Sequence, residues 1–331
     1  IIIGAQLSTQ ALSGTVLESS SIGFTDFIIH VAPAIVICMI PSLWILRKID
    51  NSGLSGERHR NIDLLKLRYG VKDKKLLIKS GIILMIVILL FFAHSAFSHP
   101  LLSVATIALG GAVAMLLLTS PHHVEEQLDS VEWTTIIFFA GLFIMIHGLE
   151  FMGLIEMIAE MISDAISKTS EENRLMIAVL LLLWVSAIAS AFIDNIPYTA
   201  TMVPVVIELA SDPLLGLPLG PLAWALALGA CLGGNGTIIG ASANVVAAGL
   251  AEESGNDISF NTFFRTGFPM MIFTVMIATV YCLVRYTINW PSNAYPIIIL
   301  TSMAIISVAF TPYVYRDSSV SNGKFINAES E

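Results

Sequence analysis

Long apolar runs separated by short polar stretches dominate the chain. A helix needs about 20 apolar residues to cross a ~30 Å hydrocarbon layer. Six runs are long enough to predict spanning helices, and they cover Phe24–Leu46, Leu76–Phe97, Leu101–Thr119, Trp133–Phe151, Gly267–Trp290 and Tyr295–Tyr315. Barrel strands would alternate apolar and polar positions, and these runs do not. The pattern therefore predicts an all-α polytopic membrane protein.

Two other apolar runs carry polar interruptions that do not suit an ordinary span. Leu175–Ile193 leads into Asp194–Thr201, which holds a proline and several polar side chains, and Trp224–Leu250 is interrupted by Gly, Asn, Thr and Ser. Unpaired backbone is tolerated at membrane depth only where it lines a protein-enclosed or wet cavity. We therefore predict a re-entrant hairpin at about residues 175–210 and a broken helix at about residues 222–251, facing each other.

Charged positions indicate how the chain lies in the membrane. Residues 47–79 hold ten of the 16 Lys and Arg, so the positive-inside rule predicts a cytoplasmic loop. An anionic-lipid site is the alternative for this loop. In Gly153–Glu172, apolar residues recur at helical spacing with acidic residues between them. That pattern predicts an amphipathic helix on the membrane surface.

A short pattern occurs twice. The spacing Ile-x-Phe-x-x-Phe-x5-Pro occupies Ile22–Pro33 and again Ile258–Pro269. Counting spans from the cytoplasmic loop makes the two helices run in opposite directions, which is the signature of an inverted repeat with its site at the repeat interface. The predicted divisions are residues 1–46 as the end of the first repeat, 47–79 as the cytoplasmic basic loop, 80–290 as the second repeat, and 291–331 as an extra span and cytoplasmic tail.

Composition agrees with the apolar pattern. Of 331 residues, 56% are hydrophobic and 12% are charged, and the mean hydropathy is +0.82, which excludes an ordinary soluble domain. The net charge of −9 is spread over loops and the tail, so nucleic acid is not an expected partner. The chain begins at Ile1 without a Met, and we expect it to be a fragment of a longer protein.

The first break carries ligand-type groups at Asp194, Asn195, Thr199 and Thr201. An isolated Asp in a membrane costs about 2.5–3.5 kcal/mol on insertion scales and usually faces a partner, a cavity or an ion path. We predict that this hairpin tip handles an ion or a proton. The alternative is that Asp194 only caps the helix that follows, or pairs with a structural Arg.

The second break places glycines beside amide and hydroxyl oxygens, at Asn235, Gly236, Thr237, Ser242 and Asn244. Glycine lets the helix unwind, freed carbonyls can coordinate a cation, and the new helix N-terminus near Ser242 directs its positive end at an anion. We predict a binding site, with close helix packing by small residues as the alternative. No cofactor is expected beyond a bound sodium ion or a coupled proton.

Other chemistry is weakly indicated. His147 and Glu150, one helical turn apart, are a candidate proton relay. A His-His-x-Glu-Glu cluster at residues 122–126 lies in a short polar loop, and we interpret it as a solvated face rather than a metal site. No Ser-His pair, facing pair of Asp or zinc motif falls at membrane depth, so an enzyme is not expected.

Three stretches resemble the P protein family, the pink-eyed dilution or oculocutaneous albinism type II protein, within the ion transporter superfamily. They are VEWTTIIFFAGLF (Val131–Phe143), WVSAIASAFIDNIPYTATMVPV (Trp184–Val205) and ALGACLGGNGTIIGASANVVAAGLAEESG (Ala227–Gly255). That superfamily also holds arsenite permeases, sodium/proton antiporters and, more distantly, dicarboxylate transporters. The resemblance covers residues 131–290 well and residues 1–46 moderately.

The resemblance implies where the site residues lie. The expected hairpin-tip residues are Asp194, Asn195 and Thr199, and those in the unwound part of the facing helix are Gly236, Thr237, Ser242 and Asn244. It also implies a mobile transport domain, a homodimer, and the membrane of a melanosome or another lysosome-related organelle, with the plasma membrane as the alternative. Ile1–Gly4 resembles the continuation of a Gly-Asp-Pro-Pro-Asn motif in the family's first half, so most of the first repeat is expected to be missing here.

The chain also departs from the family. Its basic loop is shorter than in the vertebrate protein, Met145–His147 stands where that protein has an acidic residue, and the span after Tyr295 is additional.

From the two breaks and the resemblance we predict a secondary active transporter that moves a small inorganic ion or anion across the lipid bilayer by alternating access, coupled to protons or sodium. A chloride channel that sets organelle pH is the alternative.

Overall fold

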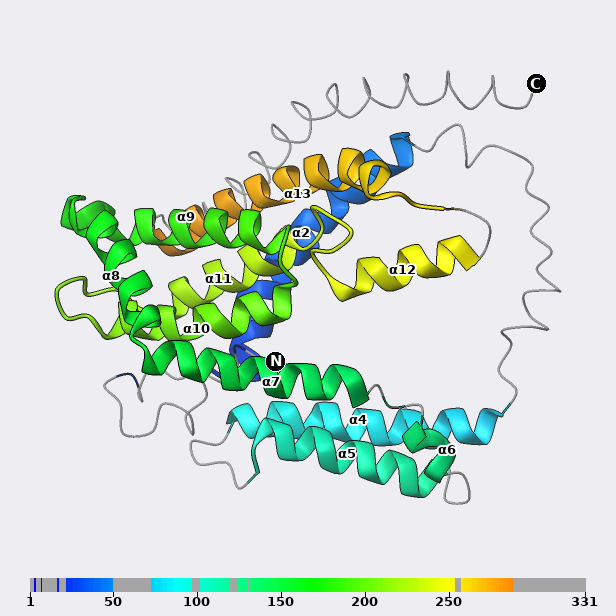
Figure 1. The fold of residues 1–331 in the computed structure, drawn as a ribbon. Helices are drawn as coiled ribbons and strands as arrows, with labels where there is room; N and C mark the ends of the chain where they lie inside the picture. Colours follow the sequence, from blue (N-terminus) through cyan, green and yellow to red (C-terminus); the bar gives the residue numbers. More distant parts are fainter. Residues whose placement is uncertain are drawn as a thin grey trace, which may run out of the picture. The chain divides into compact units, whose positions relative to one another are not determined.

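The described part of the chain is helical. The computed structural model describes residues 3, 7, 17, 22–49, 73–96, 102–119, 124–129, 131, 133–253 and 257–287. Within them, all regular structure consists of helices (Figure 1). These are α2 (Phe24–Ile49), α4 (Lys74–Ala96), α5 (Val104–Thr119), α6 (Val124–Asp129), α7 (Trp133–Phe151), α8 (Leu154–Ser167), α9 (Glu171–Ser190), α10 (Asn195–Ser211), α11 (Leu219–Gly233), α12 (Ser242–Glu253), α13 (Phe260–Cys282) and the π-helix η3 (Leu283–Thr287).

Several of these helices suit a membrane. The four that are long and apolar enough to cross it are Phe24–Leu43, Lys74–His94, Glu171–Ser190 and Phe260–Thr287. The α7–α8 pair, bent by 66°, is a fifth candidate. The chain is therefore an integral multi-pass membrane protein, and the prediction of an all-α polytopic fold is confirmed. The predicted span Tyr295–Tyr315, the tail and most of the basic loop lie outside the described residues.

The chain forms two compact units. The first comprises Ile3–Asp26 and Gly53–Leu142, and its helices α4 and α5 pack side by side (Figure 1). Apolar side chains cover their outward surface, as at Leu89 and Leu109, which are 59% and 68% exposed. A helix that is apolar on every side is suited to lipid or to a protein interior.

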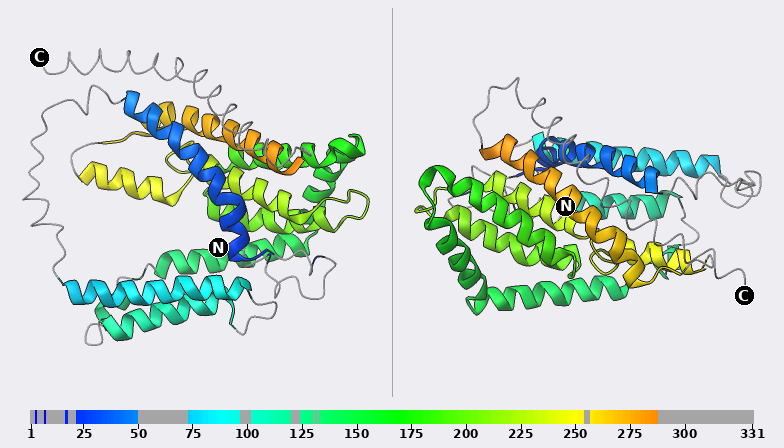
Figure 2. Two further views of the ribbon diagram at one scale, coloured as in Figure 1. Left: turned by 180° about the vertical axis from the view of Figure 1, so that it is seen from behind. Right: turned by 90° about the horizontal axis from the view of Figure 1, so that it is seen from above.

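The second unit, Phe27–Ser52 with Phe143–Glu331, contains both predicted breaks. Its centre is α11, which packs against α9, α10 and α13 and is buried along most of its length (Figures 1 and 2). Glycines in α11 let its backbone lie directly on α9. A Cβ at Gly229 would come within 2.8 Å of the Cβ of Ser186. This close packing fixes the helices that lead into the two breaks.

The predicted amphipathic helix is present as α8. It ends at Ser167, before the predicted end at Glu172, and the next helix, α9, begins at Glu171. Gly153 precedes it with φ +75°, a left-handed conformation that favours glycine. The buried residues Ile155 and Ile166 belong to a face that packs against α10 and α9. The apolar face of α8 therefore covers the helical hairpin.

Helices α2 and α13, which begin within the two occurrences of the repeated pattern, contact each other inside the second unit. That pattern recurs from position 22 to position 258. The Sγ of Cys38 lies 3.5 Å from the carbonyl oxygen of Thr274, residues separated by the same 236 positions. Further along, the Tyr281 hydroxyl donates to the carbonyl of His30 at 2.8 Å, so the helices are antiparallel. When two repeats are related by a two-fold axis, the residues that contact each other on the axis occupy equivalent positions in the two repeats. The contact thus favours the predicted inverted repeat.

Candidate functional site

The first break lies between α9 and α10 and comprises only Ala191–Asp194. The Oδ1 of Asp194 accepts the backbone N–H of Ile196 at 2.9 Å and so caps α10. Pro197 follows in the first helical turn, where its missing N–H would have had no helical partner. The helix therefore resumes directly after Asp194. The prediction of a break that extends to Thr201 is wrong.

The second break comprises residues 234–241, between α11 and α12, and it is closed by side chains. The Nδ2 of Asn244 donates to the carbonyl of Gly234 at 2.8 Å and to the carbonyl of Thr237 at 3.0 Å. Buried backbone groups need such partners. Asn244 therefore replaces helical hydrogen bonds that the unwinding removes.

The two breaks touch each other. The Thr237 hydroxyl is fully buried; it donates to the carbonyl of Ala191 and accepts the N–H of Gly240 at 3.1 Å. A Cβ at Gly240 would lie 2.9 Å from the carbonyl oxygens of Ser190 and Ala191 and 2.8 Å from that of Gly234. Only glycine fits this position, and three carbonyl oxygens, from the end of α9 and from the two breaks, gather around it.

Asp194 joins the two breaks by a second set of bonds. Its Oδ2 accepts the backbone N–H of Ser242 at 3.0 Å and the Ser242 hydroxyl at 2.6 Å. One carboxylate therefore faces the N-termini of both α10 and α12. Each helix N-terminus carries roughly half a positive charge, so the two together about balance the carboxylate. The capping role holds for α10, but Asp194 does more than cap that helix.

The predicted site residues fall into two groups. The structure brings together Asp194, Gly236, Thr237, Ser242 and Asn244, since Gly236 also packs on Ala191. The others are more peripheral: Thr201 donates to a carbonyl of its own helix at 3.0 Å, Thr199 is buried in α10, Asn195 is half-buried and Asn235 is exposed.

Three hydroxyl residues behind the breaks were missed from the sequence. Ser190 donates to the carbonyl of Ala230 at 2.7 Å, and the Tyr198 hydroxyl donates to Ser186 at 3.2 Å. Both serines are fully buried. Their spacing of four residues in an apolar helix places them on one face, which is the signal that could have found them.

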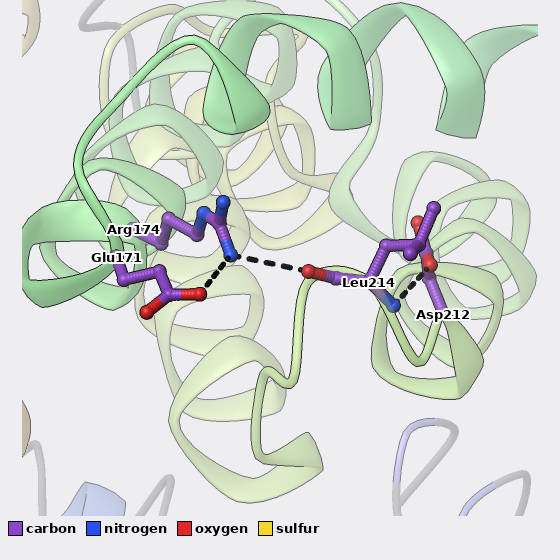
Figure 3. Close-up of polar contacts among 4 residues, drawn as sticks. All are labelled: Glu171, Arg174, Asp212 and Leu214. Carbon is purple, nitrogen blue, oxygen red and sulfur yellow. Dashed lines mark hydrogen bonds and ion pairs between the residues drawn. The ribbon is translucent and has the colours of Figure 1, made fainter.

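A polar cluster closes the other end of the hairpin (Figure 3). Arg174 in the first turn of α9 donates to the carbonyl of Leu214 at 3.1 Å and pairs with Glu171 at 3.6 Å. Asp212 in turn accepts the N–H of Leu214 at 2.8 Å. Arg174 thus holds the loop after α10. In the candidate relay, the Nδ1 of His147 lies 3.3 Å from the Oε2 of Glu150, and both side chains are exposed.

Apolar helices that break in mid-segment and meet at a carboxylate, in a multi-pass membrane protein, are typical of membrane transporters. Comparison with known proteins gives the same class. Residues 1–229, more than half of the chain, match the citrate transporter family. The chain belongs to that family.

Named relatives agree with this assignment. The P proteins of Sus scrofa and Homo sapiens are each 47% identical over 228 residues, which is 69% of this chain and 27% of theirs. The resemblance to P proteins is thereby confirmed, and the chain spans about a quarter of their length. An uncharacterized transporter of Mycobacterium tuberculosis is 39% identical over 279 residues, 82% of this chain and 61% of its own. No solved structure matches.

Proposed function

We propose that the two breaks form the substrate site of a secondary active transporter that moves a small anion by alternating access. The observation that carries this proposal is the position of Asp194, which accepts donors from the N-termini of both α10 and α12. Two converging helix N-termini attract oxyanions. The family name, citrate transporter, points to a carboxylate-bearing anion.

Coupling to a proton or to sodium follows from the same site. An anion that approaches the two N-termini also approaches the Asp194 carboxylate, and like charges at short distance repel each other. A cation taken up with the anion lowers that cost. The carbonyl oxygens of Ser190, Ala191 and Gly234 lie close together around Gly240, and carbonyls at helix breaks and C-terminal ends are typical sodium ligands in transporters.

Transport by the full-length protein in liposomes tests this proposal. Uptake of radiolabelled citrate is measured with a proton gradient, with a sodium gradient and with neither. Asn244→Ala exposes the break carbonyls, and we expect it to reduce uptake by about tenfold or more, the equivalent of about 1.4 kcal/mol. The control is Ser259→Ala, which removes the cap of α13, a hydroxyl that accepts the Thr262 N–H at 3.3 Å.

The results separate the possibilities. Uptake that needs a gradient, saturates and falls only in the Asn244 variant agrees with a coupled carrier. Equal uptake in all variants contradicts the site. Single-channel chloride currents, with flux far above carrier turnover, would contradict the carrier. The homodimer and the melanosome-type membrane remain predictions, to be checked by the native mass and by the location of the tagged full-length protein.

A further inference from the structure

We propose that the link between Asp194 and Ser242 is a latch, closed while the site is empty and opened whenever the site is loaded. This inference rests on the proposed function, because it assumes that a ligand binds between the breaks. It goes further by giving Ser242 a role opposite to that of a ligand. Ser242 would hold Asp194 in place until the ligand displaces one of them.

The two carboxylate oxygens of Asp194 accept hydrogen bonds from different helices. Oδ1 is engaged within its own element, where it accepts the Ile196 N–H at 2.9 Å. Oδ2 alone reaches across to α12, and both of its donors come from Ser242, a residue 48 positions away. The carboxylate can therefore remain the cap of α10 while its bonds to α12 break. A link that opens without unfolding either helix is suited to a moving part.

Binding of an anion at α12 or of a cation at Asp194 competes with the Asp194–Ser242 bonds. An anion at the N-terminus of α12 needs the Ser242 N–H, which Asp194 now occupies. A cation that coordinates both oxygens of Asp194 needs a lone pair of Oδ2, whose acceptor positions Ser242 fills with two donors. In both cases the ligand gains its contacts only after the Asp194–Ser242 bonds are lost. The closed link and the loaded site therefore exclude each other.

A weaker latch should raise the apparent affinity for the ligand. The apparent affinity of a ligand falls in proportion to the fraction of molecules in the binding-competent state. Ser242→Ala removes the 2.6 Å hydroxyl bond and leaves the backbone bond in place. We expect apparent citrate affinity to rise by about threefold to tenfold, as the loss of part of a charge-assisted link implies. If the Ser242 hydroxyl were instead a ligand, the same substitution would weaken binding.

The experiment measures citrate binding to the purified full-length protein by titration calorimetry, at constant pH and sodium concentration. Ser242→Ala should bind more tightly, Ser242→Thr should restore the wild-type affinity because it keeps the hydroxyl, and Ser259→Ala should match the wild type. Ser259 is a fair control because it is also an exposed serine at a helix N-terminus and its hydroxyl accepts an N–H, that of Thr262.

Weaker or unchanged citrate binding by Ser242→Ala overturns the latch and leaves the proposed site intact. Absence of citrate binding in the wild type, with protons or with sodium, overturns both.

Discussion

The two helix breaks solve the same problem in different ways. The α9–α10 break is four residues long, and the next helix restarts on a local cap, because Asp194 bonds the N–H two residues later. The α11–α12 break is eight residues long, and its groups are satisfied by Asn244, by Thr237 and by the carbonyl of Ala191 in the first break. The helix after the first break restarts on a cap from a neighbour in sequence. The second break is closed by Asn244 and also depends on contact with the first break.

The two breaks should therefore respond differently when the surrounding helices move. A self-contained cap can keep its shape when its surroundings move, since its hydrogen bond is local. A break held by distant groups changes shape when those groups move. We therefore expect substitutions in the second break to affect both stability and binding, and substitutions in the first break that leave Asp194 in place to affect stability little.

The largest loss of stability is expected from Gly240→Val. Three carbonyl oxygens lie within 2.9 Å of the position that a Cβ would take, and overpacking of this kind costs about 3 kcal/mol or more when backbone must shift. Thermal unfolding of the detergent-solubilised protein, followed by tryptophan fluorescence, measures the loss. Gly249→Ala is the control, since nothing lies within 4 Å of a Cβ there; it should stabilise α12 by about 0.5–1 kcal/mol. Similar melting of both variants would contradict the close approach of the breaks.

Asn244→Ala should have the next largest effect. It leaves the carbonyls of Gly234 and Thr237 without their amide donor, and unsatisfied groups of this kind cost about 1–3 kcal/mol. The free energy of unfolding is compared with that of Asn173→Ala. The Asn173 amide donates to the exposed Ser170 hydroxyl at 3.1 Å, so we expect a change within about 0.5 kcal/mol there. Equal effects at the two positions would show that the second break does not depend on Asn244.

Thr237→Val should cost somewhat less. The substitution keeps the shape of a fully buried side chain but removes the hydroxyl that joins Ala191 to Gly240. We expect a loss of about 1–2 kcal/mol in unfolding free energy. Thr237→Ser keeps the hydroxyl and should retain most of the stability. If the serine variant is as unstable as the valine variant, packing rather than the hydrogen bonds holds the breaks together.

The smallest effect is expected from Pro197→Ala in the first break. Pro197 lies in the first turn of α10, where alanine is equally compatible with a helix, so the change acts mainly through the entropy of the unfolded chain and costs about 0.4–1 kcal/mol. Citrate binding should be unchanged. A large loss of stability, or altered binding, would show that the first break is not self-contained and would remove the contrast between the two.

Sequence reasoning located both breaks but drew their limits differently. Proline and glycine disrupt helices in general, so Pro197 suggested a break as far as Thr201, whereas the local cap at Asp194 allows a helix to begin before it. The bond between Asp194 and Ser242 joins residues 48 positions apart, and no local pattern predicts such a pair. The spacing of Ser186 and Ser190 marks one face of α9, but the partner of Ser190, the carbonyl of Ala230, is on another helix and could not be predicted from that spacing. Periodicity predicts faces of helices, and tertiary packing decides which faces meet.

The contact between Cys38 and Thr274 has an evolutionary consequence. If the two repeats descend from one ancestral gene, then before duplication this contact lay between two identical chains, at the centre of a dimer. A residue there would have touched its own copy, and every substitution would have changed both sides at once. Fusion of the two genes removes that constraint. A cysteine and a threonine now meet at this position, a pairing that no symmetric ancestor could have held.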